Sequence, residues 1–145
     1  MVLKFMKYLL KIAAFFAIAV FFSCEGKEWF VNCPDCTSEE PEFALVKIKL
    51  KDIHSLVSVK VYEGDLEDDI LYSSFDIQGS DYTAKTSFNK NYTFTATYSI
   101  DGITYVAVSS ATPRVRYEEN QCENPCYFIY DNIVDLRLKY TAAGK

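Results

Sequence analysis

Four cysteines stand in two close pairs, Cys33-Pro-Asp-Cys36 and Cys122-Glu-Asn-Pro-Cys126. In an exported protein such pairs predict two disulfides, and four cysteines allow three connectivities. A bond inside either pair would close a tight, strained loop, so the sequence favours bonds that join one pair to the other. A Cys36–Cys122 bond, taken as an example, would enclose about 87 residues and stabilise the fold by roughly 4–5 kcal/mol through loop entropy.

Two other chemistries fit the same four cysteines. Thiolates from two close pairs could hold a tetrahedral zinc ion, although export into an oxidising compartment argues against it. The first pair could also be redox active, which requires a cysteine at a helix N-terminus to lower its thiol pKa. Here that pair lies among acidic residues that would raise the pKa instead: Asp35, Glu39, Glu40 and Glu42. We therefore expect disulfides, with no metal and no cofactor.

Other residues offer little for catalysis. His54 is the only histidine, so any Ser-His-Asp or Cys-His arrangement must use it, and it lies in a turn where a histidine is usually solvated. The acidic run 63–69, treated as a calcium loop beginning at Asp65, has Ile70 at the sixth position and Asp76 at the twelfth instead of glycine and glutamate. Two interpretations of this run therefore remain: an irregular calcium site, or an acidic loop that is simply solvated. A glycosidase-type pair of carboxylates is defined by the distance between the two groups, which the sequence does not give. A chain this small, however, has little room for a substrate cleft. We expect no enzyme.

The N-terminus has the pattern of an export signal. Lys4, Lys7 and Lys11 precede an apolar run, residues 12–22, which ends at the small residue Ser23. A basic start, a short apolar middle and a small residue at the cut are typical of a secretory signal. As a helix the run would measure about 16 Å, against a hydrocarbon core of about 30 Å, so an uncleaved membrane helix is the weaker alternative.

The residues around the cut resemble a known motif. Phe21-Phe22-Ser23-Cys24 resembles the lipobox of bacterial lipoproteins, with Phe21 in place of the usual leucine. The resemblance implies that the signal is residues 1–23, that the thiol of Cys24 is diacylated, and that its amine is usually acylated too. It also accounts for the fifth, odd cysteine. Two or three acyl chains give lasting attachment where one holds only marginally, so we expect a membrane anchor at Cys24.

Composition limits the remaining chain. Removal of residues 1–23 lowers the 15 basic residues by three and leaves 20 acidic ones, so the net charge falls from −5 to −8. That balance argues against binding nucleic acid or an anionic lipid surface. The remaining 122 of 145 residues fit one domain. The full chain has 22 Tyr and Phe with only five Gly and four Pro, a composition that favours strands.

We divide the mature chain into a lipidated cysteine with an acidic tether, residues 24–42, and a strand domain, residues 43–145. Alternating residues from Phe43 onward, and turn signals every eight to twelve residues, predict about seven short strands. Asp101-Gly102 suits a type I′ hairpin turn. That turn pairs Tyr98 with Tyr105 on the core face, and it puts four residues together on the opposite face: Thr95, Thr97, Val106 and Val108.

These patterns predict an all-β fold: a Greek-key immunoglobulin-like β-sandwich, preceded by a signal-peptide helix and a short tether. Two resemblances refine it. Phe88-Asn-Lys-Asn-Tyr92 resembles the tyrosine corner of fibronectin type III and immunoglobulin-like domains, in which the tyrosine hydroxyl bonds back to the backbone. Residues 132–138 resemble the closing strand of transthyretin-like, carboxypeptidase-regulatory-type domains. The whole chain is similar to small Bacteroidetes-type outer-membrane lipoproteins, which implies a location and little mechanism.

Two functions fit these patterns. The first is a lipid-anchored, non-enzymatic interaction module in the outer membrane that docks on a protein partner, as an accessory subunit of a larger assembly. Its candidate surface is Thr95, Thr97, Val106 and Val108, because such a face is too apolar to be simply solvated, unless it lies inside the sandwich. The alternative is a glycan-binding module, since 11 tyrosines offer flat faces for stacking on sugars.

Overall fold

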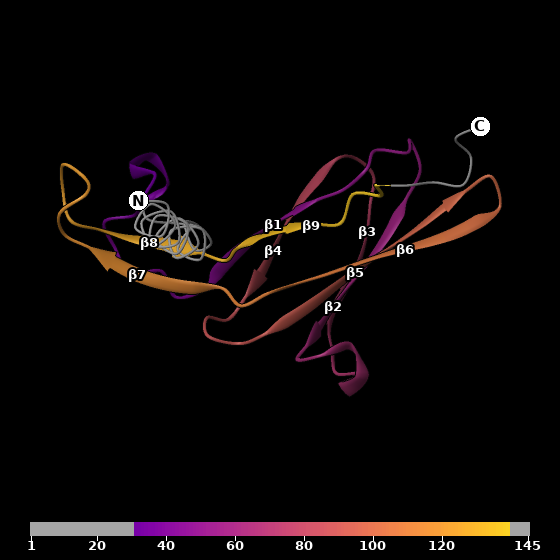
Figure 1. Ribbon diagram of the computed structural model, residues 1–145, viewed down its shortest axis with the longest axis horizontal. Coiled ribbons are helices and arrows are strands. Elements are labelled where there is room, and N and C mark those ends of the chain that lie inside the picture. Colours follow the sequence, from indigo (N-terminus) through magenta and orange to yellow (C-terminus); the bar gives the residue numbers. More distant parts are fainter. Residues whose placement is uncertain (1–30, 140–145) are drawn as a thin grey trace, which may run out of the picture. The chain divides into compact units, whose positions relative to one another are not determined.

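Strands dominate residues 31–139, the part of the chain that the computed structural model describes (Figure 1). Residues 1–30 and 140–145 lie outside it, and with them the expected signal peptide and Cys24. The strands are β1 (Ala44–Lys49), β2 (Val57–Glu63), β3 (Leu71–Ile77), β4 (Asp81–Thr86), β5 (Tyr92–Ile100), β6 (Ile103–Ala111), β7 (Arg114–Glu118), β8 (Cys126–Tyr130) and β9 (Ile133–Asp135). Two 3₁₀ turns, η1 (Cys33–Asp35) and η2 (Leu66–Asp68), complete the regular structure. No helix among these residues is long and apolar enough to cross a membrane.

Two sheets form a sandwich, which confirms the all-β prediction. One has the strand order β4-β1-β9 and the other β3-β2-β5-β6, while β7 and β8 make a separate two-stranded sheet. A single apolar cluster draws residues from both larger sheets. The seven expected strands are present. The β7–β8 hairpin is additional, because the sequence predicts only a loop around residues 122–126.

The strand order refines the sandwich prediction. β1 pairs antiparallel with β4 and parallel with β9, whereas β2 lies in the other sheet between β3 and β5. In constant-type immunoglobulin domains the first two strands share a sheet. Here the chain crosses from one sheet to the other directly after β1, so the order departs from that arrangement.

Alternation along the strands builds the core. Successive side chains of a strand point to opposite faces, so alternate residues of β1 and β2 face inward, whereas Leu45 lies on the outer face and is 46% exposed. The inward set is fully or almost fully buried: Ala44, Val46, Ile48, Val57, Val59 and Val61. The lysines between them lie on the outer face, as the sequence predicts.

The β5–β6 hairpin has the predicted turn and register. Asp101 and Gly102 have φ angles of 51° and 76°, both positive as a type I′ turn requires. The turn sets Tyr98 opposite Tyr105 and Thr97 opposite Val106.

Two buried tyrosines tie strands to loops through their hydroxyl groups. The Tyr92 hydroxyl accepts a hydrogen bond from the Ser87 backbone N–H at 3.2 Å, as the tyrosine-corner resemblance implied. The Tyr98 hydroxyl accepts from the Lys51 N–H at 3.1 Å and donates to the Leu136 carbonyl at 2.8 Å. Burial raises the pKa of Tyr98, so its proton is retained for that donation. Tyr98 thereby joins β5 to the segments that follow β1 and β9.

Two buried threonines differ in whether their hydroxyl group has a hydrogen-bond partner. The Thr93 hydroxyl, on a side chain 6% exposed, donates to the Gly64 carbonyl at 2.8 Å. Thr86 is 1% exposed, and its hydroxyl is the one buried side-chain polar atom without a partner among residues 31–139. A buried hydroxyl without a hydrogen bond costs free energy that a methyl group would not.

We expect opposite effects from the same substitution at these two sites. Thr86→Val should raise the free energy of unfolding by about 1–2 kcal/mol, because it removes an unsatisfied hydroxyl at similar shape. Thr93→Val should lower it by about 1 kcal/mol, because it removes a made hydrogen bond. Urea unfolding of the mature chain measures both. A shift of the same sign in the two variants would contradict this account of the core.

Candidate functional site

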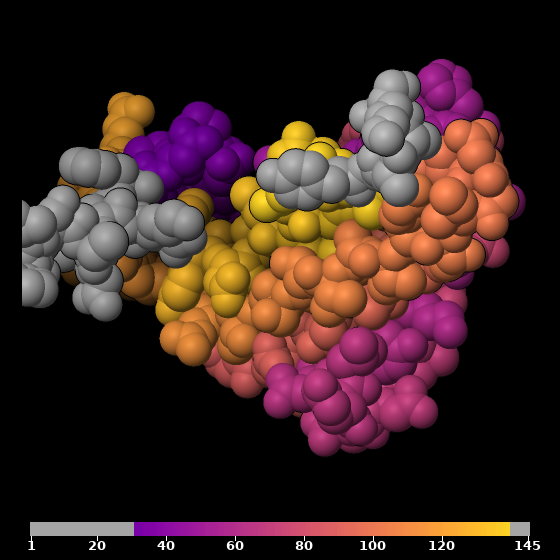
Figure 2. All heavy atoms as spheres, turned by 45° about the vertical axis from the view of Figure 1, so that its right-hand side comes forward, coloured from indigo at the N-terminus to yellow at the C-terminus, as the bar shows by residue number. Residues whose placement is uncertain are grey.

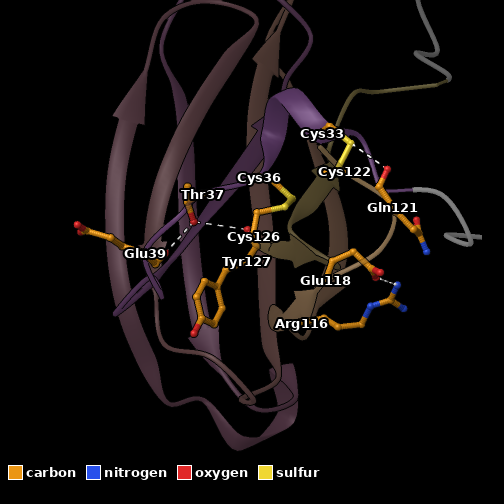
Figure 3. The surroundings of a disulfide bond; sticks show 10 residues. All are labelled: Cys33, Cys36, Thr37, Glu39, Arg116, Glu118, Gln121, Cys122, Cys126 and Tyr127. Atoms are coloured by element: carbon orange, nitrogen blue, oxygen red, sulfur yellow. Dashed lines mark hydrogen bonds and ion pairs between the residues drawn. A yellow bond between two sulfur atoms is a disulfide. The ribbon is translucent and has the colours of Figure 1, made fainter. Parts of the chain in front are cut away.

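Two disulfides join the cysteine pairs to each other. Cys33 is bonded to Cys122 and Cys36 to Cys126, with Cα–Cα distances of 5.6 and 5.5 Å (Figure 3). These distances lie in the usual range for disulfides. The prediction that bonds run between the pairs is confirmed. The Cys36–Cys122 bond taken as an example is wrong, because Cys36 is bonded to Cys126 and Cys122 to Cys33.

The second cysteine pair is placed by the hairpin that the sequence did not reveal. β7 and β8 pair from Arg114 opposite Tyr130 to Glu118 opposite Cys126. Cross-strand contacts support the pairing, because the rings of Tyr117 and Tyr127 lie 5.0 Å apart. The polar loop between the strands carries Cys122, so the hairpin presents both cysteines near one end.

Backbone pairing extends the hairpin on its β8 side. Thr37 and Tyr127 form an antiparallel bridge, in which the Thr37 N–H donates to the Tyr127 carbonyl at 3.0 Å and the Tyr127 N–H donates back at 2.7 Å. Residues 33–37, which belong to the expected tether, are thus held by two disulfides and two backbone hydrogen bonds. We call residues 33–37 together with β7 and β8 the clamp.

The clamp is tied to the sandwich at the base of the hairpin. The Thr112 N–H donates to the Asp131 carboxylate at 2.7 Å, which closes the hairpin where its strands begin and end. The Lys47 N–H donates to the Asn132 carbonyl at 2.8 Å, and the Asn132 side-chain amide donates to the Leu45 carbonyl at 3.2 Å. The N-terminal segment is therefore connected to β1 both along the chain and across the hairpin.

The sulfur atoms in the clamp also test the zinc alternative. Those of Cys36, Cys122 and Cys126 all lie within 4.8 Å of one another, which is the one metal-sized group of such ligands within the described chain. In the bonded state they are not thiolates, and thiolates are what zinc requires. The Cys33 sulfur lies 3.6 Å from the Gln121 carbonyl oxygen, a packing contact because a bridged sulfur carries no proton. The site as built is a structural cross-link.

An open groove runs beside the clamp. It has a volume of about 730 Å³ and is lined by residues 36–43 together with Leu45 and Ile129. Glu39, Glu40 and Glu42 stand along it. The apolar lining residues, Pro41, Phe43, Leu45 and Ile129, offer apolar contact. The three carboxylates disfavour any anion there.

The candidate partner surface is exposed in part. We call Thr95, Thr97, Val106 and Val108, on the outer face of β5 and β6, the docking face. Val106 and Val108 are 57% and 53% exposed, whereas Thr97 is half-buried and Thr95 only 7% exposed. Thr95 lies between Lys60 and Val108 on the neighbouring strands, so a longer side chain flanks it on one side and a valine on the other. The accessible part of the face is therefore the two valines, and the prediction that Thr95 is accessible is wrong.

The remaining candidate residues do not gather. His54 lies in an exposed turn, where its backbone N–H donates to the Asp52 carboxylate at 2.9 Å. In the acidic run, the Glu63 carboxylate accepts a 2.8 Å bond from Lys90 and thereby raises the pKa of that lysine. Asp65 accepts from the Asn91 amide at 3.2 Å. These two carboxylates are engaged by the connection between β4 and β5. No three acidic groups of residues 31–139 approach closely enough to share an ion.

Aromatic contacts bear on the glycan alternative. A sugar platform needs two or three exposed, coplanar rings. The aromatic pairs of the described chain are inclined: 65° for Tyr72 with Tyr92, 37° for Phe75 with Tyr82 and 50° for Tyr117 with Tyr127. None of these pairs presents the flat surface that stacking on a sugar ring would use.

Comparison of the chain with protein-family models, with curated proteins and with solved structures finds no match. Function must be inferred from the residues themselves.

The second disulfide should add less to the stability of the fold than the first. The chain segments they join are 89 and 90 residues apart, so a single bond contributes about 4–5 kcal/mol, while the second closes a ring of only about nine residues and adds about 2–3 kcal/mol. Cys36→Ser/Cys126→Ser, which leaves one bond, should lose the smaller amount. Cys33→Ser/Cys36→Ser, which removes the same number of cysteines but both bonds, should lose the sum. Urea unfolding without reductant measures both, and equal stability of the two variants would contradict the connectivity.

Proposed function

We propose that this chain is a lipid-anchored, non-enzymatic interaction module of the cell envelope. It is held in the outer membrane by acyl chains on Cys24 and docks on a membrane protein as an accessory subunit of a larger assembly. The observation that carries the proposal is the exposure of Val106 and Val108 side by side on a regular sheet face.

The position of the clamp supports a role close to the membrane. Cys33, the first residue of the clamp, follows Cys24 by nine residues. A fully extended chain spans about 3.3–3.6 Å per residue, so the clamp lies within about 30 Å of an acylated Cys24. Because the clamp is joined to β1 by hydrogen bonds and by the chain, the sandwich follows the anchor closely. A short connection of this kind suits a subunit that docks on a neighbour in the same membrane.

The docking face supports a protein partner. Exposed apolar residues on the polar side of a sheet are a common mark of binding surfaces. Both valines lie on a strand without a charged residue, and charge depletion is typical of the centre of a protein interface. Enzyme function has less support, since the only histidine is exposed in a turn and two carboxylates of the acidic run are engaged by Lys90 and Asn91.

The anchor is tested by Cys24→Ser. The acyl chains attach through that sulfur, so the variant should lose incorporation of a labelled fatty acid and should no longer be cut before residue 24. Its sandwich should remain folded, because the core residues all come from residue 44 onward. Metabolic labelling and membrane fractionation in an exporting bacterial host provide the readout. Undiminished fatty-acid incorporation in the variant would refute the anchor.

The docking face is tested by Val106→Ser/Val108→Ser. Removing two exposed apolar side chains from an interface should weaken partner binding tenfold or more, since about 1.4 kcal/mol corresponds to tenfold. Leu56→Ser, at a 62% exposed residue outside the docking face, is the matched control. Capture of full-length chain from native membranes, after cross-linking, should recover one large membrane protein with the wild type and the control but not with the double variant. Equal recovery by all three, or binding only to glycans on an array, would reject the proposal.

A further inference from the structure

The sheet edges of this protein differ in how they are protected. An edge strand presents unpaired backbone groups, and natural proteins usually guard it with charges, bulges or a covering segment. β4 carries Asp81 and Lys85, and β7 carries two arginines and a glutamate. β3 is interrupted by a register shift against β2. β9 is only three residues long and ends at Asp135, whose carboxylate pairs with Arg137 at 2.7 Å.

Two edge strands, β6 and β8, contain no charged residue, and the edge of β8 is covered by another segment. β8, with the sequence CYFIY, is paired on its outer side with Thr37 and cross-linked through Cys126. β6, with the sequence ITYVAVSSA, is nine residues long, and β5 is its only neighbour in its sheet among residues 31–139. β9 approaches β6 from the opposite sheet but does not pair with it. In Figure 2 the orange residues of this part of the chain lie at the surface, next to the yellow C-terminal ones.

The free side of β6 has a regular set of backbone groups. Residues of an antiparallel ladder alternate between pairs that exchange hydrogen bonds and pairs that do not. The two-residue turn makes Ile100 and Ile103 a hydrogen-bonded pair, so every second residue from the next one onward directs its N–H and C=O away from β5. These residues are Thr104, Val106, Val108 and Ser110.

We propose that β6 pairs with β6 of a second copy of this chain, antiparallel and about a two-fold axis at Ala107. The strand's midpoint is Ala107, so this register overlaps all nine residues. It places Val106 opposite Val108 of the other copy, and the outward backbone groups of each strand meet those of its partner. Because the strand has no charge, it opposes no like charges to itself, although the chain as a whole is acidic. The result is one continuous eight-stranded sheet.

The dimer enlarges the docking face. Both exposed valines of each copy lie on the same side of the joined sheet, so four valines form one apolar surface around the axis. A single strand pair is small beside the ~1,600 Å² of a standard interface. Confinement of both copies to one membrane raises their effective concentration and compensates for the small area. In that respect the dimer rests on the proposed function, which supplies the lipid anchor.

Cysteine cross-linking of the full-length chain in membranes tests the register. Residues opposite each other have Cα atoms about 5.5 Å apart, within disulfide range, whereas Val106 of one copy lies about 8–9 Å from Val106 of the other. Cells that produce differently tagged Val106→Cys and Val108→Cys chains together should therefore yield a disulfide heterodimer on mild oxidation. Either variant alone should yield about tenfold less, because cysteines whose Cα atoms lie more than about 7 Å apart cannot bridge without backbone movement. Thr83→Cys, on the exposed part of the charged edge strand β4, is the control and should give no dimer.

Each other outcome overturns the pairing. Equal cross-linking in the single and mixed cells would indicate chance collision. No cross-linking, with thiols that react with a maleimide, would show an open edge that does not pair. No cross-linking with thiols that do not react would show that another segment, such as residues 140–145, or another protein covers β6. Failure of the proposed function is distinguishable, because partner capture is measured with the wild-type chain. Heterodimers of the cysteine variants, with no membrane partner captured by the wild type, would leave the dimer standing. A partner captured by the wild type, without heterodimers of the variants, would leave the proposed function standing.

Discussion

The structure depends on a covalent constraint between two segments about 90 residues apart. Because the loop-closure entropy removed from the unfolded chain grows with the length of chain enclosed, one cross-link over this separation stabilises the fold by about 4–5 kcal/mol. The first bond confines the N-terminal segment to the hairpin, and the second fixes its orientation, because two adjacent bonds prevent rotation about either one. The backbone bridge between Thr37 and Tyr127 then forms between groups already held side by side. What would otherwise be a flexible acidic tether becomes part of the folded unit.

This constraint relates the N-terminal segment to the sandwich. The hydrogen bonds of Asn132 and Asp131 link the base of the hairpin to β1 and to the end of β6. Tyr98 links β5 to the segments after β1 and β9. A force applied at the N-terminal segment is therefore distributed over both sheets. On the proposed function, the lipid positions a rigid sheet with its uncharged strand, β6, at a defined short reach from the membrane.

Much of the sandwich follows from local sequence. Alternation in residues 44–50 and 57–61, and the Asp101-Gly102 turn, suffice to predict strands, faces and register, because each depends on neighbours along the chain or across one hairpin. The β7–β8 hairpin could not be found this way. β7 is short and rich in arginine, and Pro125 stands directly before β8, so the segment resembles a loop. The connectivity of the cysteines depends on that hairpin and was open for the same reason. Thr95 is a different case: its face was predicted correctly, but its burial depends on neighbouring strands, and the residue opposite it on β2 is Lys60, about 35 residues earlier.

Peptide mapping of the full-length chain recovered from membranes, without reduction, tests the central claim most directly. Cleavage after acidic residues separates Cys33 from Cys36 at Asp35 and Cys122 from Cys126 at Glu123, so each cysteine lies on its own fragment. The account predicts two linked pairs, Cys33 with Cys122 and Cys36 with Cys126, and no alkylatable thiol among the four. Bonds within each pair, or four free thiols with a stoichiometric zinc ion, would contradict it.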